Sequence, residues 1–169
     1  MLRWLLLCAL LLPGLPAAAQ LPAPDPEMTQ NRAFRVKFQV PAHWLVSRQR
    51  TDSVEVLRYH DPADGTHLWV ARLRGRPAHT RPARALQRLL RQLGATRHAE
   101  HRATAHGLDF LESTGTCRVG GRELRYDARV TMHQGQVLLV YLYATPTAFN
   151  TRAPLLHRVL DSFTPLPAD

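Results

Sequence analysis

The clearest hydrophobic pattern lies between residues 136 and 163 and predicts a strand, a short turn and a helix. From Val137 to Ala144 every residue is apolar or aromatic. This run is typical of a strand covered on both faces, because a half-exposed strand would alternate with polar residues. Apolar residues then recur at helical spacing, and Pro154 among them predicts a late start or a break in a helix over about 147–162. They are Phe149, Leu155, Leu156, Val159, Leu160 and Phe163.

The chain before residue 80 predicts four strands, the last two forming a hairpin. Apolar and polar residues alternate from Phe34 to Val40, which is the period of a half-buried strand. A second strand starts at Trp44, and residues 53–60 and 66–73 are two further strand-like runs. The turn from Asp61 to Gly65 has proline early and glycine late, which is typical of a hairpin turn.

Residues 80–93 predict the first helix. Thr80 is placed to cap it, Pro82 suits its first turn, and Gly94 can end it in a left-handed conformation. Four leucines form one apolar stripe, and four arginines lie on the opposite side. The leucines are Leu86, Leu89, Leu90 and Leu93, and the arginines are Arg81, Arg84, Arg88 and Arg91.

Four strand-like segments follow this helix, separated by short breaks that contain glycine. Such breaks indicate hairpins, so we expect sequential antiparallel strands and an α+β fold. Because the strand over 137–144 is apolar on both faces, we expect a helix on each face of a mostly antiparallel sheet, which makes a three-layer α-β-α sandwich. The segments are 96–105, 108–117, 123–132 and 136–144.

The N-terminal residues have the pattern of a secretory signal. Arg3 gives a positive start, residues 5–12 are apolar, and Ala17 to Ala19 form a small-residue cleavage site. The apolar run is short for a membrane span, which favours cleavage over a retained anchor. We expect a periplasmic or secreted protein with no transmembrane segment after cleavage. Its predicted parts are a signal peptide (1–19), a proline-rich linker without strand pairing (20–33), one domain (34–165) and a tail (166–169).

Charge and cysteine content narrow the functional classes. The net charge is +9, and Lys37 is the only lysine, so the positive charge comes almost entirely from arginine. This balance favours an anionic partner such as a membrane surface, an acidic protein or a polyanion. Beyond the signal, Cys117 is the one cysteine, which excludes a disulfide scaffold. A half-buried strand cysteine is favoured over a nucleophile.

Motifs of the common enzyme classes are absent from the sequence. There is no Gly-x-Ser-x-Gly, His-Glu-x-x-His or Cys-x-x-Cys and no phosphate-binding glycine loop. Asp109 and Glu112 are three apart in a predicted strand, so they face opposite sides and do not form an acid/base pair. We predict no enzyme and no cofactor. A hydrolase assembled from scattered Ser, His and Asp stays open as an alternative.

The two ends of the predicted domain resemble the PsbP-like family, which includes exported DcrB-type proteins. Val40-Pro41-Ala42-His43-Trp44 is similar to the family's entry motif, with His43 where glycine usually stands. Ala144-Thr145-Pro146, followed by a helix that ends Val159-Leu160-Asp161-Ser162-Phe163, is similar to its closing motif. The resemblance implies a PsbP-like α-β-α sandwich and a non-catalytic binding or assembly domain, with no catalytic residues to carry over.

Three histidines are weak candidates for a metal site, because imidazole binds zinc, copper and nickel. They are His98, His101 and His106. On a regular strand the first two point to opposite faces, so a site would need a bulge or another ligand such as His133 or His157. The spacing fits no known ligand pattern. We therefore predict no metal and favour ordinary surface histidines.

Six arginines on and just before the first helix are the candidate partner-binding residues. On one surface they would bind phosphate or carboxylate groups, and the alternative is an ordinary solvated helix face. Nucleic acid is not expected, because the chain is predicted to be exported and no aromatic residues interleave with these arginines. The arginines are Arg74, Arg76, Arg81, Arg84, Arg88 and Arg91.

Two functional hypotheses follow. The first is an exported, non-catalytic binding or assembly module of the cell envelope that contacts an envelope protein or an anionic surface through its basic surface. The alternative is a periplasmic protein that binds a small molecule or a metal with its sheet and strand histidines. Four aromatic residues either line a pocket or belong to the core, and the core is favoured. They are Trp44, Trp69, Tyr141 and Tyr143.

Overall fold

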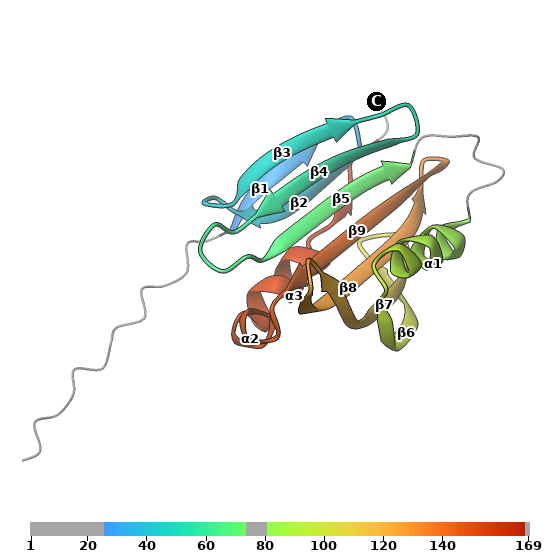
Figure 1. The fold of residues 1–169 in the computed structure, drawn as a ribbon. Coiled ribbons are helices and arrows are strands. Elements are labelled where there is room, and N and C mark those ends of the chain that lie inside the picture. The colour runs from blue at the N-terminus through green and yellow to red at the C-terminus, as the bar shows by residue number, and fades with distance from the viewer. Residues whose placement is uncertain (1–25, 74–80, 168–169) are drawn as a thin grey trace, which may run out of the picture.

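The computed structural model describes residues 26–73 and 81–167 (Figure 1). The strands are β1 (Pro26–Asn31), β2 (Val36–Pro41), β3 (Leu45–Arg50), β4 (Val54–His60), β5 (His67–Leu73), β6 (Thr96–Ala105), β7 (Leu108–Val119), β8 (Arg122–His133), β9 (Gln136–Ala144) and β10 (Thr164–Pro165). The helices are α1 (Pro82–Gln92), α2 (Pro146–Thr151) and α3 (Ala153–Asp161).

Seven strands form one antiparallel sheet in the order β3-β4-β5-β9-β8-β7-β6. The predicted β4–β5 hairpin and the predicted sequential pairing from β6 to β9 are both confirmed. β9 lies between β5 and β8, and every residue from Val137 to Ala144 is buried. The prediction of a strand covered on both faces is therefore confirmed.

The two faces of this sheet have different covers. On one face, Leu138 and Val140 of β9 pack with residues of β2 and α3 into a large core. A second sheet, β1-β2-β10, closes this side together with α2 and α3. On the other face, Leu139 and Tyr141 pack with α1. The α+β class holds, whereas the three-layer α-β-α sandwich is not confirmed, because strands and helices share one outer layer.

β1 contradicts the prediction that an unpaired linker extends to residue 33. Residues Pro26–Asn31 pair antiparallel with β2, from Pro26 opposite Pro41 to Asn31 opposite Val36. β1 is an edge strand, and a proline at its first residue is tolerated there because no ladder hydrogen bond is lost. The predicted signal peptide and the first part of the linker lie outside the described residues.

The helices end largely as the sequence predicts. Gly94 follows α1 with a φ of 55°, the left-handed conformation that favours glycine. Thr80, the predicted cap, lies outside the described residues, and Arg81 stands at the N-cap position without a side-chain cap hydrogen bond. The closing helix breaks at Arg152 into α2 and α3. Pro154 then lies in the first turn of α3, where its missing N–H does no harm.

A buried carboxylate joins the β4–β5 turn to the break between α2 and α3. Asp61 is 1% exposed and pairs with Arg152. It also accepts hydrogen bonds from Trp44 Nε1 at 3.1 Å and from Ala63 N at 2.8 Å. His43 Nε2 lies 3.0 Å from the same carboxylate. Although burial favours the neutral acid, the bonds from Arg152, the Ala63 amide and His43 lower the pKa of Asp61 to about 2.

Asp61→Ala is expected to destabilise the domain by about 1–3 kcal/mol, because it leaves the buried Trp44 N–H without its acceptor and leaves Arg152 with Asp64 as its remaining acidic partner. Urea unfolding at neutral pH measures this change. Asp52→Ala is the matched control, since Asp52 is exposed in the β3–β4 turn and its loss should change stability by less than about 0.5 kcal/mol. Equal unfolding midpoints for the two variants would contradict a stabilising role for Asp61.

Candidate functional site

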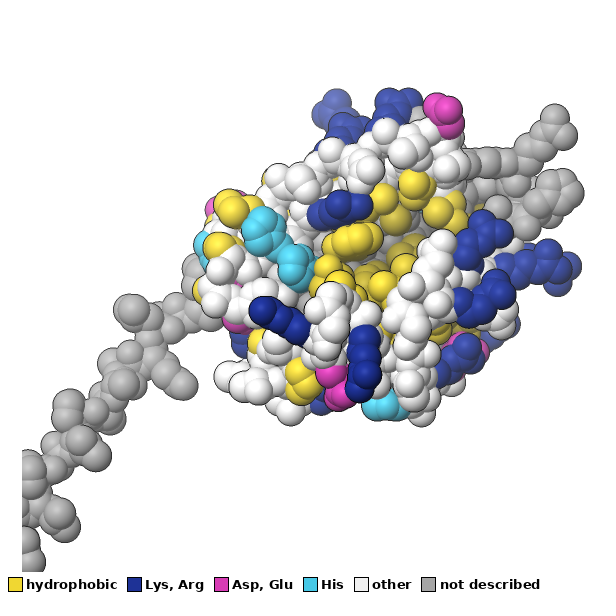
Figure 2. Space-filling model, viewed as in Figure 1, with side chains coloured by type: hydrophobic (Ala, Val, Ile, Leu, Met, Phe, Trp, Pro, Cys, Tyr) yellow, Lys and Arg dark blue, Asp and Glu magenta, His cyan; other side chains and the backbone are white. Residues whose placement is uncertain are grey.

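A groove lies between α1 and one half of the seven-stranded sheet. α1 packs over β8 and β9, and no helix in the described part of the chain covers the same face of β4 and β5. Figure 2 shows this face, where apolar side chains line a hollow with basic side chains around it. The groove has a volume of about 550 Å³. This size is typical of small-molecule sites.

The floor of the groove is built from neighbouring residues of three strands. Val56 in β4 lies opposite Ala71 in β5, and Ala71 lies opposite Leu139 in β9, so the three side chains form one row across the sheet. Trp69 continues the floor along β5, and Ala85 lines the side formed by α1. The small side chains of Ala71 and Ala85 leave room between helix and sheet.

Guanidinium groups line both walls of the groove. Arg84 and Arg88 lie one turn apart on α1, and both are exposed. On β4, the guanidinium carbon of Arg58 lies 4.3 Å from the centre of the Trp69 ring. Arg58 Nη2 also donates to Gln49 Oε1 at 2.7 Å. These two contacts orient Arg58. Among the described residues that line the groove there is no Asp or Glu, so its lining is positively charged.

The Nε of Arg58 is a buried donor without an acceptor among the described residues. Buried polar groups nearly always have a partner, since an unsatisfied one costs about 1–3 kcal/mol. Arg58 was not a predicted site residue, although the sequence held a signal for it. A five-residue turn from Asp61 to Gly65 fixes the hairpin register, which places Arg58 directly opposite Trp69.

The structure brings two of the six predicted arginines to the groove. Arg81 lines a second cavity beside the start of α1, and Arg91 lines a shallow cavity at its other end. Arg74 and Arg76 lie outside the described residues. A single surface shared by all six arginines therefore stays a prediction, while Arg84 and Arg88 share one wall.

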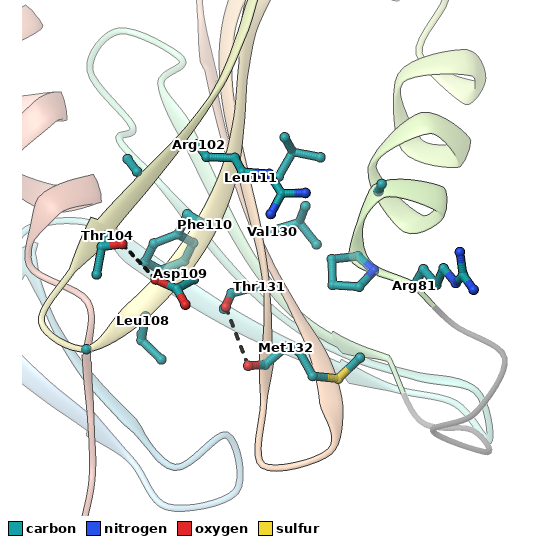
Figure 3. A pocket seen from close by; sticks show the side chains of 14 residues that line it. Arg81, Arg102, Thr104, Leu108, Asp109, Phe110, Leu111, Val130, Thr131 and Met132 are labelled. Carbon is teal, nitrogen blue, oxygen red and sulfur yellow. Dashed lines mark hydrogen bonds between the residues drawn. The ribbon is translucent and has the colours of Figure 1, made fainter.

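The second cavity opens where β7 and β8 separate (Figure 3). Its volume is about 780 Å³. Pairing of the two strands starts at Leu111 opposite Val130, so residues 108–110 do not pair with the end of β8. Arg102 and Asp109 both extend toward this space in Figure 3. Because Asp109 accompanies Arg81 and Arg102, this cavity lacks the uniform positive charge of the groove.

The three candidate histidines do not form a metal site together. His101 Nε2 lies 3.1 Å from Glu112 Oε2 on β7. His98 lies at a register shift in β6, and His106 lies in the turn that follows this strand. Over residues 26–73 and 81–167, no group of three or more His, Cys, Asp or Glu is placed to hold a metal ion. The absence of a metal stays a prediction.

Buried carboxylates surround an arginine on the opposite face of the sheet. Glu112 Oε1 lies 3.2 Å from Arg129 Nε, and Asp127 Oδ1 lies 3.8 Å from the same nitrogen. Arg129 Nη1 also pairs with Asp161 at 2.8 Å. Burial raises the pKa of Asp127 to about 6, against the opposing charge of Arg129. Asp109 is exposed, as expected if it faces away from Glu112.

Cys117 and most of the candidate aromatic residues belong to the core. Cys117 is 2% exposed, deeper than predicted, and its Sγ lies 3.3 Å from Tyr141 Oη. Burial raises the pKa of Tyr141 above its ordinary value. Trp44 and Tyr143 are buried as well. Trp69 is half-buried and lines the groove, and Tyr141 contributes to the same lining. The alternative that the aromatic residues line a pocket therefore holds for these two residues.

Several solved structures share this fold. Cyanobacterial PsbP (CyanoP) from Synechocystis sp. PCC 6803 has a TM-score of 0.63 and 13% identity, over 90% of this chain and 98% of that chain. PA94 from Pseudomonas aeruginosa, a putative regulator of unknown function, has a TM-score of 0.53 and 16% identity, over 85% and 99%. LpqN, involved in cell envelope biogenesis of Mycobacterium tuberculosis, has a TM-score of 0.51 and 18% identity, over 78% and 83%.

No protein-family model and no curated protein matches the sequence of this chain. The structural matches nevertheless cover most of the chain, and they include PsbP itself. The chain therefore has the PsbP-like fold that its two end motifs predict. His43, which stands where the family usually has glycine, contacts Asp61 in this structure.

Asp127→Asn is expected to raise stability more at about pH 8 than at about pH 4. The folded pKa of about 6 lies above the ordinary value of 3.8 for an aspartate, so wild-type stability falls as pH rises through this window. Ionised Asp127 then costs up to about 3 kcal/mol, a cost that asparagine lacks. Arg129, Glu112, His157 and Asp161 act on the same carboxyl.

Melting temperatures across this pH range measure the effect of Asp127→Asn. Asp109→Asn, the same substitution at an exposed position, is the control for the chemical change itself. A gain for Asp127→Asn that does not change with pH would contradict a raised pKa.

Proposed function

We propose that this protein is an exported, non-catalytic binding module of the cell envelope that holds an anionic partner in the groove. The observation that carries the proposal is the set of guanidinium groups from Arg58, Arg84 and Arg88 around an apolar floor. Arginine binds carboxylate and phosphate groups with two parallel hydrogen bonds. Such bonds are stronger in a recess of low dielectric than in open water.

The charge pattern of α1 supports a role beyond helix stability. The first turn of α1 has no acidic residue, and Arg81 and Arg84 stand near its N-terminus. Positive charge at a helix N-terminus opposes the macrodipole and is unfavourable by a few tenths of a kcal/mol or more. An anionic partner would offset this repulsion.

Two observations support an envelope location. The first 19 residues have the pattern of a secretory signal. LpqN, which shares the fold, is involved in cell envelope biogenesis. Within the described part of the chain, no helix is long and apolar enough to cross a membrane.

The lining of the groove supports a binding role over a catalytic one. Ser53 and Tyr141 are its hydroxyl groups, and none of its described residues is a His, Cys, Asp or Glu that would serve as a base. Cys117 is buried beside Tyr141, away from solvent. A nucleophile with an adjacent base is thus not part of this site.

A small-molecule ligand is the second candidate, and the size of the groove favours it. In this alternative the small molecule binds in the groove and not at the strand histidines, because the lining of the groove does not include His98, His101 or His106.

The Arg84→Gln/Arg88→Gln double variant is expected to lose a salt-sensitive association with an anionic envelope component. The protein would carry a photo-crosslinking amino acid at Gln92, an exposed residue at the end of α1 that lines the groove, and would be incubated with a native envelope extract at low and moderate salt. Charge pairing on an exposed rim weakens as salt rises, so crosslinking should fall with salt and with the double variant.

Arg118→Gln/Arg122→Gln is the matched control for this experiment. It removes the same charge from exposed residues beside the β7–β8 turn, and neither residue lines the groove. Equal loss of crosslinking in both double variants would show that only net charge matters and would contradict a site at the groove.

A further inference from the structure

We infer that the anionic partner in the groove is a single-chain monocarboxylate amphiphile, with its hydrocarbon chain on the row Val56, Ala71 and Leu139 and its carboxylate on Arg58. The inference rests on the proposed function and names the chemistry of the ligand. It follows from three properties of the groove: an apolar row of Val56, Ala71 and Leu139 at its floor, charge confined to the walls, and a limited volume.

The floor suits a hydrocarbon and does not suit a peptide. Main-chain groups of β4, β5 and β9 beneath it are already paired within the sheet, because these strands pair with one another along their lengths. A peptide across this surface would bury its own amide groups against Val56, Ala71 and Leu139 without partners, which is unfavourable. Strand addition also requires a free sheet edge, and the floor is the sheet's face. A methylene chain has no such groups to satisfy.

The walls place the charge where the end of such a chain would lie. Arg58 lines the groove and is held by Trp69 and Gln49, and its Nε has no acceptor among the described residues. The planar fork of a guanidinium matches the two oxygens of one carboxylate. Because Arg58 is already oriented, binding loses little side-chain freedom. Arg84 and Arg88 on the opposite wall add attraction for the same negative head.

The capacity of the groove limits the ligand to one chain of moderate length. Its volume is about 550 Å³, in the middle of the range for small ligands. The helix residues that line it extend from Arg84 to Gln92. Eight residues of α-helix rise by roughly 12 Å, which sets the length of the apolar wall. A two-chain lipid would leave one chain in water.

Laurate is the probe for the test, used below the concentration at which it forms micelles. Binding is followed by titration calorimetry and by intrinsic tryptophan fluorescence, since Trp69 lines the groove. Laurate should bind, and dodecyltrimethylammonium, with the same chain and a positive head, should not. Arg58→Met, which keeps the stem and removes the donors, should weaken binding roughly tenfold or more, the scale of one charge-assisted hydrogen bond.

Ala71→Phe is the variant that fills the groove and leaves all three arginines in place. It should abolish laurate binding, and a melting curve verifies that the variant folds. Ala85→Phe, from the helix side, replaces it if Ala71→Phe does not fold. Arg118→Gln/Arg122→Gln should bind laurate as wild type does. The inference is wrong if both amphiphiles bind equally, if the folded filled variant still binds laurate, or if lysophosphatidic acid binds and laurate does not.

Failure of this inference and failure of the proposed function give different results. If laurate does not bind but the Gln92 crosslink still depends on Arg84 and Arg88, the basic site stands and its partner has another chemistry. If the crosslink is absent in every extract and laurate binds with dependence on Arg58, the amphiphile inference stands alone. If neither occurs, both are wrong.

Discussion

The fold depends on the need to bury β9 on both faces. Its side chains alternate between two cores, so each face of the central sheet requires a cover. One face receives a complete cover from β1, β2 and β10 together with α2 and α3. The other face receives α1, which has eleven residues and lies over β8 and β9. The groove is the part of that face, over β4 and β5, that α1 is too narrow to cover.

Internal ion pairs hold the complete side together. Asp61 joins the β4–β5 turn to Arg152, and Glu55, fully buried in β4, pairs with Arg48 and Arg72. Burial favours neutral Glu55, but the hydrogen bonds and charges of the two arginines lower its pKa overall. Each of these two carboxylates therefore forms ion pairs with arginines of the protein itself. The arginines that border the groove have no acid beside them in its described lining, which is why its charge is available to a ligand.

The sequence predicted the parts of the structure that depend on neighbouring residues. The β4–β5 hairpin, the meander from β6 to β9 and the break before Pro154 all follow from local turn and spacing rules. β1 was missed because its first residue, Pro26, ends a proline-rich run that resembles a linker, and because its conformation depends on pairing with β2. Arg152 lies 91 residues from Asp61, so no local pattern could reveal that pair.

The groove itself was only partly predictable. Arg84 and Arg88 were identified from the helical stripe, because the face of a helix can be read from spacing alone. The contribution of Arg58 depends on the register of the hairpin. The apolar floor depends on the pairing of β5 with β9, and 63 positions of sequence separate the end of β5 at Leu73 from the start of β9 at Gln136. Which half of the sheet a short helix leaves open is a tertiary property that hydrophobic periodicity does not contain.

The outer sheet has a practical consequence for chemical labelling. Lys37 in β2 carries the only side-chain amine in the protein, and it is half-buried opposite Gln30 of β1 and Thr164 of β10. Its neighbours Val36 and Phe38 point into the core, so Lys37 points outward on the side of the molecule away from the groove. Amine-reactive dyes therefore have one side-chain target, where a fluorophore would leave the groove unobstructed.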